Sequence, residues 1–413
     1  MATTRWGWLA GRLWGRLWFR GSLFSLAGVA VALAAVFLGP LLPAGASRRI
    51  GADAVGDILR ILASSMLTVA TFSLSTLVSA YSSATANATP RATTLLMEDS
   101  TAQNALGTFI GAFLFSLVGL IALSTGLYGE EGRSLLFLAT LAVVAVVVLT
   151  LLRWIDRLPR MGRVAETMER VEEAAIAALR EAALAPSFGA APAPPGPPPG
   201  AHPIRAAGNG YIVHLDLEAL ERAGERLGGL QLRLVPGKLV HRGAVLAWSR
   251  EVPDGAAEAA VRDAVLLGRD RSFGQDPRFG LLVLAEIGSR ALSDGINDAG
   301  TAIRVLAGGL RAFDAWANPG EARGEAARYP HLAIPALDPA ELVADFFRPL
   351  ARDGAGNPDV MARLLKSLAA LPELGGEGLR GPAEAEARRA LALAEAAIAL
   401  PEELEALRRL APG

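Results

Sequence analysis

A row of hydroxyl side chains runs through the apolar stretch Ile58–Ala80 and slightly beyond it. Its members are three or four residues apart, so a helix would place them all on one face. Such a face could line a path for water, ions or a small solute if several subunits turn it inward. It could equally serve helix packing, because serine and threonine bond to carbonyl oxygens of the preceding turn and let helices approach closely. The candidate pore-lining residues are Ser64, Thr68, Thr71, Ser75, Ser79 and Ser82.

Charged residues follow this row after Pro90, which is expected to end the helix. Arg91, Glu98 and Asp99 would then lie at the cytoplasmic mouth of a path along the helix. There they could select ions, or they could form a solvated loop. Further along, Gly107 and Gly111 form a GxxxG pair, which predicts close helix packing.

The sequence SRALSDGINDAGTA (289–302) predicts a turn between two helices, over Phe279–Leu292 and Ala299–Phe313, with Gly295 in a left-handed conformation. Capping by one of the two side chains just before the second helix explains part of the pattern. The other polar groups could hold an anion or a small cation. The ligand-binding candidates of this turn are Arg290, Ser293, Asp294, Asn297 and Asp298.

A second set of polar residues lies in the loop GRDRSFGQDPRFG (268–280). The helix predicted between this loop and the turn would hold them ~20 Å apart at 1.5 Å per residue. We therefore expect separate sites within one subunit. The two could meet across a subunit interface, which cross-linking between positions 271 and 294 would test. The ligand-binding candidates of the loop are Arg269, Arg271, Gln275 and Asp276.

Several kinds of chemistry are disfavoured by what the sequence lacks. The chain has no cysteine, which removes disulfides, thiolate nucleophiles and cysteine-based metal sites. Its four histidines show no ligand spacing, and neither a Gly-Lys-Ser/Thr phosphate loop nor an Asp-Lys-Thr-Gly phosphorylation site occurs. Because no nucleophile–base pair can be identified, we expect no enzyme activity, no cofactor and no metal site.

Four apolar stretches must position the hydroxyl row, and each is near the ~20 residues that a membrane-spanning helix needs. Apart from Arg60 and Arg153 at their boundaries, they contain no ionisable side chain, which argues against a proton relay. The chain is 52% hydrophobic with a net charge of −1, so we expect the lipid bilayer, and no nucleic acid, as a partner. The predicted spans are Ser22–Leu42, Ile58–Ala80, Leu106–Leu127 and Ser134–Trp154.

Arginine is concentrated before the first span and after the fourth, which predicts that both termini are cytoplasmic. The first 21 residues also alternate arginine with tryptophan, as expected of a short interfacial helix. These tryptophans are Trp6, Trp8, Trp14 and Trp18.

The rest of the chain predicts a cytoplasmic α+β domain whose C-terminal part is mostly helical. Asp216 is expected to cap a short helix between the strands Tyr211–Leu215 and Leu230–Val235, followed by a turn at Pro236-Gly237 and a strand over Ala244–Ser249. The predicted parts are an interfacial segment 1–21, a four-helix transmembrane domain 22–157, an amphipathic helix 158–185, an extended Pro/Gly/Ala linker 186–207, a β-α-β-β module 208–250 and a helical domain 251–413.

With these residues in view, the chain resembles the bacterial membrane proteins grouped as domain of unknown function 2254. The resemblance covers nearly the whole chain, although this sequence has Asp294 and Ala299 where the family usually has proline. It implies a four-span inner-membrane protein with a cytoplasmic domain and supplies no activity. The motifs that carry it are Thr-Pro-Arg (89–91), Glu98-Asp99, LGTFIGAFLFSL (106–117), Gly-Tyr-Ile (210–212), PGKLVHRGAVL (236–246), GRDRSFGQDPRFG (268–280) and RALSDGIND (290–298).

Two functions rank ahead of an enzyme, for which neither a nucleophile–base pair nor a metal cluster can be identified. The first is a homo-oligomeric channel or passive transporter for a small ion or solute, with the hydroxyl row as pore lining and the cytoplasmic domain as regulator. The second is a membrane-anchored regulatory or scaffolding protein whose cytoplasmic half binds a partner or a small ligand.

Overall fold

The structure is a computed structural model that describes Gly7, Trp14 and residues 16–38, 52–320, 328–375 and 377–411. The predicted interfacial segment lies largely outside the described residues, as do Trp6 and Trp8, whereas Trp14 and Trp18 are exposed. The chain divides into two compact units. We call Gly11–Ala86 with Thr93–Glu166 the span unit, and Met1–Ala10, Asn87–Ala92 and Thr167–Gly413 the mixed unit.

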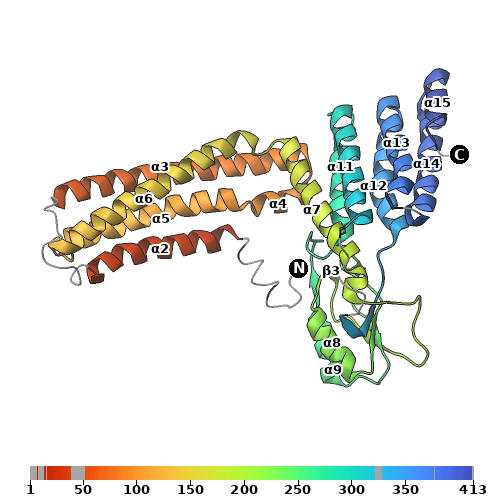
Figure 1. Ribbon diagram of the computed structural model, residues 1–413, viewed down its shortest axis with the longest axis horizontal. Helices are drawn as coiled ribbons and strands as arrows, with labels where there is room; N and C mark the ends of the chain where they lie inside the picture. Colours follow the sequence, from red (N-terminus) through yellow and green to blue (C-terminus); the bar gives the residue numbers. More distant parts are fainter. Residues whose placement is uncertain are drawn as a thin grey trace. The chain divides into compact units, whose positions relative to one another are not determined.

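Among the described residues, four helices are long and apolar enough to cross a membrane (Figure 1). Each contains most of one predicted span, although residues 39–42 of the first lie outside the described part. The second is the longest, at 36 residues or ~54 Å, which exceeds the ~30 Å of a hydrocarbon core. The helices are α2 (Leu17–Leu38), α3 (Ala52–Asn87), α5 (Ser100–Ser124) and α6 (Glu130–Arg157), with the short α4 (Thr93–Met97) before α5.

Helix α5 lies at the centre of the span unit, and half of its most apolar window is buried. Its GxxxG pair packs against α2, as predicted: a Cβ at Gly111 would lie 2.7 Å from the carbonyl oxygen of Phe24, and one at Gly107 would lie 2.8 Å from its ring. The α2 side of this crossing contributes Gly28, which abuts the backbone of Gly111. Two apolar clusters around Phe109 and Phe115 fill the interior of the unit.

The mixed unit contains a five-stranded sheet in the order β1-β8-β4-β6-β2. Strand β8 is parallel to both of its neighbours, whereas β6 is antiparallel to both of its own. The predicted linker 186–207 is therefore wrong, because it contributes strands at both edges of this sheet. The strands are β1 (Ala190–Pro192), β2 (His202–Arg205), β4 (Leu230–Leu232), β6 (Val245–Ser249) and β8 (Tyr329–Ile334).

A second sheet is antiparallel, in the order β5-β3-β7, with bounds Leu239–Val240, Gly210–Leu215 and Val265–Gly268. Asp216 caps α8 (Leu217–Arg226) by accepting a hydrogen bond from the Ala219 backbone, as predicted. The β-α-β-β module 208–250 is not self-contained, since β3 pairs with β7 and β4 pairs with β8, both outside it. Helix α8 packs with α9 (Gly255–Ala264) beside these strands (Figure 1).

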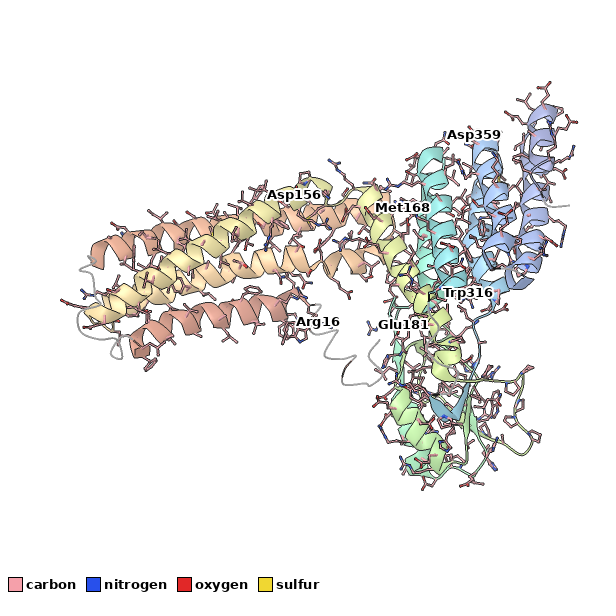
Figure 2. All side chains as sticks on the ribbon, viewed as in Figure 1. Arg16, Asp156, Met168, Glu181, Trp316 and Asp359 are labelled. Carbon is pink, nitrogen blue, oxygen red and sulfur yellow. The ribbon has the colours of Figure 1, made fainter. Side chains whose placement is uncertain are left out.

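The remaining helices of the mixed unit pack side by side away from the strands (Figure 1). Helix α7 (Val164–Leu184), the predicted amphipathic helix, buries one face that includes Met168 (Figure 2). It approaches α10 so closely that a Cβ at Gly280 would lie 2.7 Å from the Cα of Ala175. The other helices are α10 (Pro277–Ala291), α11 (Ala299–Ala317), α12 (Pro339–Asp353), α13 (Pro358–Gly375), α14 (Glu377–Ala397) and α15 (Pro401–Arg408).

The close approach of α2 and α5 predicts that Gly111→Ala destabilises the span unit. The added methyl would overlap the Phe24 carbonyl, and separating two packed helices should cost about 1–3 kcal/mol. Thermal unfolding of the detergent-solubilised chain measures this, with Gly21→Ala as the control because nothing lies within 4 Å of its Cβ position. Equal midpoints for the two variants would contradict the crossing.

Candidate functional site

The six predicted hydroxyl residues all lie on the exposed face of α3. Three of them donate to carbonyl oxygens of the preceding turn: Ser64 to Ile61, Thr68 to Ser64 and Thr71 to Leu67, at 3.1, 3.0 and 2.7 Å. Large apolar side chains flank the row, and the buried face of the helix carries Leu62, Met66, Ala70 and Leu77. The row therefore does not pack against the other described helices of its own subunit.

The three charged residues predicted at the mouth belong to different units. Asp99 is buried in the span unit, where it caps α5 and pairs with Arg157 at 3.1 Å. Arg91 belongs to the mixed unit, where it pairs with Glu286 of α10. Thr89 donates to the same carboxylate at 3.1 Å, so Glu286 holds the loop after α3 at two points. Glu98 is exposed.

The turn between α10 and α11 is exposed from Ser293 to Asp298. The prediction that Gly295 is left-handed is wrong: Asn297 takes that conformation, with φ of 50°. Asparagine tolerates it better than most residues because of its short polar side chain. Asp298 caps α11, accepting from the Thr301 backbone at 3.0 Å and from its hydroxyl at 2.6 Å. Capping thus accounts for Asp298, while the exposed Arg290 and Asp294 remain outside the cap.

The loop before α10 is held inside the mixed unit. Gln275 bonds both backbone groups of Leu215, accepting from its N–H at 2.7 Å and donating to its oxygen at 3.3 Å. Arg271 binds Asp276 through two hydrogen bonds of 2.7 and 3.0 Å and lies over the ring of Phe279. Arg269 is exposed. The loop and the turn lie at opposite ends of α10, about 22 Å apart at 1.5 Å per residue, which agrees with the predicted separation.

The PGK turn (236–238) packs directly over the Asp276 carboxyl. Gly237 has φ of 91°, and a Cβ there would lie 2.6 Å from the Asp276 Cγ. Two backbone hydrogen bonds to Ile212 fix the turn. The Gly237 N–H donates to the Ile212 oxygen, and the Lys238 oxygen accepts from the Ile212 N–H. Two segments that are 39 positions apart in sequence thus form one packed corner, and Lys238 extends from it.

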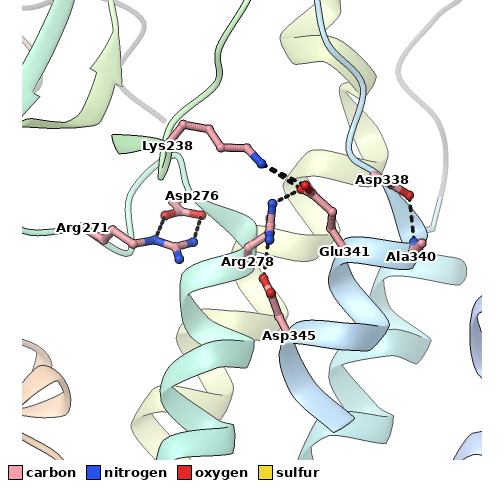
Figure 3. Close-up of polar contacts among 8 residues, drawn as sticks. All are labelled: Lys238, Arg271, Asp276, Arg278, Asp338, Ala340, Glu341 and Asp345. Carbon is pink, nitrogen blue, oxygen red and sulfur yellow. Dashed lines mark hydrogen bonds and ion pairs between the residues drawn. The ribbon is translucent and has the colours of Figure 1, made fainter. Parts of the chain in front are cut away.

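Lys238 joins a network of charges that the sequence did not reveal (Figure 3). Its Nζ lies 3.0 Å from both carboxylate oxygens of Glu341, which also pairs with Arg278. Arg278 in turn donates from Nε to Asp345 at 2.8 Å. The one available signal was that Lys238 is one of only two lysines in an arginine-rich chain.

Burial shifts the pKa values of this network. Burial raises the pKa of Asp276, and the bonded Arg271 guanidinium opposes that rise. Burial lowers the pKa of Lys238, and the nearby Arg278 lowers it further. Both pKa shifts arise first because the charged groups are held away from water. The cations Lys238, Arg271 and Arg278 also lie close enough to influence one another.

The chain is similar to one protein family and to several bacterial proteins. The sequence profile of one family, described as predicted membrane protein DUF2254, matches residues 14–370. One uncharacterized protein of Mycobacterium bovis and two of Mycobacterium tuberculosis are 35% identical over 121 residues. That match covers 27% of this chain and 23% of each relative, so the chain aligns with less than a quarter of their length. No solved structure matches the chain.

The cap on α11 predicts that Asp298→Ala costs about 1 kcal/mol of unfolding free energy, whereas Asp294→Ala stays within about 0.5 kcal/mol because it caps nothing. Hydrogen bonds from Thr301 lower the Asp298 pKa below its ordinary value of 3.8. The stabilisation is therefore present at neutral pH and lost as the pH falls through the lowered folded-state pKa. Thermal unfolding between pH 7 and pH 2 checks this, and a difference between the two variants that does not shrink as the pH falls would contradict it.

The packed corner predicts that Gly237→Ala destabilises the mixed unit more than Gly243→Ala does. Both glycines have a left-handed backbone, with φ of 91° and 84°, so both variants incur strain of about 1 kcal/mol or more. Only Gly237 faces the Asp276 carboxyl, since nothing lies within 4 Å of a Cβ at Gly243. The difference between the two thermal midpoints measures the clash alone, and equal losses would refute it.

Proposed function

We propose that this chain, which belongs to the DUF2254 family of predicted membrane proteins, forms a homo-oligomeric channel or passive transporter for a small ion or solute. The observation that carries this proposal is the exposure of all six hydroxyl residues on α3 of a single subunit. We place the protein in the bacterial inner membrane with both termini cytoplasmic, as the arginine distribution favours.

The proposed pore lies between subunits because large apolar side chains fill the interior of the span unit. Buried side chains such as Phe109, Phe115 and Leu136 fill the space among its helices. On the opposite face of α3, each hydroxyl that donates to its own helix keeps oxygen lone pairs that can contact water or a cation. Facing copies of this row would supply such oxygens along several turns without any membrane charge, which suits passive conduction rather than proton-coupled exchange.

The mixed unit is proposed to regulate this path. The loop Asn87–Ala92 follows α3 directly in the chain, and Glu286 of α10 binds it through Thr89 and Arg91. A change in α10 would therefore act on a segment covalently joined to the hydroxyl helix.

The subunit arrangement can be tested with single cysteines, because the chain has none of its own. Ser75→Cys should form disulfide-linked dimers under oxidation if the rows of neighbouring subunits face one another. Thr76→Cys is the matched control, since it lies one residue later and thus about 100° around the helix. Equal or absent cross-linking at both positions, in protein shown to be folded, would count against the proposed interface.

Conduction is tested by liposome flux across a panel of cations, anions and small neutral solutes. We expect selective flux that Thr71→Leu with Ser75→Leu lowers about tenfold or more, because leucine removes the oxygens and narrows the path. Thr76→Leu loses a hydroxyl with the same kind of bond to its own helix and should leave the flux unchanged. If folded, membrane-inserted wild-type protein shows no flux of any solute in the panel, the channel proposal is rejected and the membrane-anchored regulatory alternative is favoured.

A further inference from the structure

Two cations of the mixed unit, Lys238 and Arg278, hold the carboxylate of Glu341 (Figure 3). Lys238 contacts both oxygens at 3.0 Å. The two cations thus bind the Glu341 carboxylate in the way that they would bind a separate anion. The side chains of Lys238 and Glu341 are 38% and 42% exposed. Ion pairs this accessible to water typically contribute only about 0–1 kcal/mol. The Arg278 side of the site is only 16% exposed, so an anion that replaces Glu341 must restore the contact to Arg278 as well as the one to Lys238.

Arg278 has a second partner besides Glu341, and Lys238 rises from a fixed backbone. Arg278 is held by Asp345 through its Nε at 2.8 Å, and its side chain is only 16% exposed. Lys238 stands on a fixed backbone, since its oxygen accepts from the Ile212 N–H at 3.0 Å. Groups that are already in place lose little conformational freedom when a ligand binds, which favours affinity.

Charge balance favours an incoming anion once Glu341 moves away. Lys238 and Arg278 form ion pairs with Glu341 and Asp345, and a separate pair of Arg271 with Asp276 lies beside them (Figure 3). Without Glu341, three cations face two carboxylates, and one of these, Asp276, is fully committed to Arg271. Burial is the main cause of the lowered pKa of Lys238, and the charge of Arg278 lowers that pKa further, against the opposing charge of Asp345.

We infer that Lys238 and Arg278 form a binding site for a phosphate-bearing anion, and that Glu341 occupies this site as an internal competitor. A guanidinium with a neighbouring ammonium suits phosphate, because the planar fork and the point charge together contact several oxygens. Binding requires Glu341 to leave, so the first turn of α12 is the element that a ligand would release. This site does not depend on the proposed channel.

The test is calorimetric titration of the detergent-solubilised full chain with inorganic phosphate, at ionic strength held constant with chloride. We expect Glu341→Gln to bind phosphate about tenfold more tightly than wild type, because glutamine leaves the cations without their competitor. Adding Lys238→Met or Arg278→Met to that variant should abolish the gain. Glu402→Gln on α15 and Lys366→Met, which change charge elsewhere on the exposed surface, should leave phosphate binding unchanged.

A folded Glu341→Gln variant that binds phosphate no more tightly than wild type would overturn the inference and leave a purely structural salt bridge. If that variant does not fold, stabilisation of the wild-type thermal midpoint by phosphate, lost in Lys238→Met, decides the matter in its place. Nanodiscs of phosphatidylcholine with and without phosphatidic acid identify the source of the phosphate group. Competition by phosphatidic acid would assign a lipid headgroup, whereas equal phosphate binding in both would assign a free anion.

Discussion

The mixed unit depends on the close packing of α10 against three other helices. Gly280 allows contact with α7, and Gly288 makes room for Leu350 of α12 and Val305 of α11. Most residues of α10 are buried, so its position is fixed along its whole length. The functional candidates of this unit all lie on α10 or next to one of its ends. The charge network lies at its N-terminus, Glu286 lies within it, and the exposed turn follows its C-terminus.

Local patterns predicted the elements of this chain well. Four apolar stretches became four long helices, because apolar length alone decides that outcome. Asp216 caps its helix as expected, and Asp298, one of the two candidates, caps the other, since a cap depends only on residues within one turn. The positive φ at Asn297 rather than Gly295 shows where this reasoning stops. Glycine permits a left-handed conformation without requiring it, and the hydrogen bonds of the turn decided which residue took it.

Non-local pairing accounts for what the sequence did not reveal. The Pro-rich segment 186–207 reads as a linker because its own composition favours no regular structure, yet β1 finds a partner in β8, far along the chain. The same holds for the charge network, whose members come from a turn, from the start of α10 and from α12. Lys238 and Glu341 are separated by 103 positions, and spacing in sequence carries no signal for such a contact. The hydroxyl row is partly local and partly non-local. Its common helix face was predictable from spacing, but its exposure depends on which side of α3 the other helices cover.

Glu286 gives these features a physical connection. Its carboxylate binds Thr89 and Arg91, so the loop that continues from α3 is part of the same compact unit as α10. Helix α10 begins next to Asp276 and Arg278, whose charges meet those of α12. A packed helix transmits displacement along its axis because its interior is not compressible. Any rearrangement of α12 that shifted the start of α10 would therefore either strain the bonds of Glu286 or carry the loop with it. The arginine side of the Arg91–Glu286 ion pair is 57% exposed, so water competes for this link.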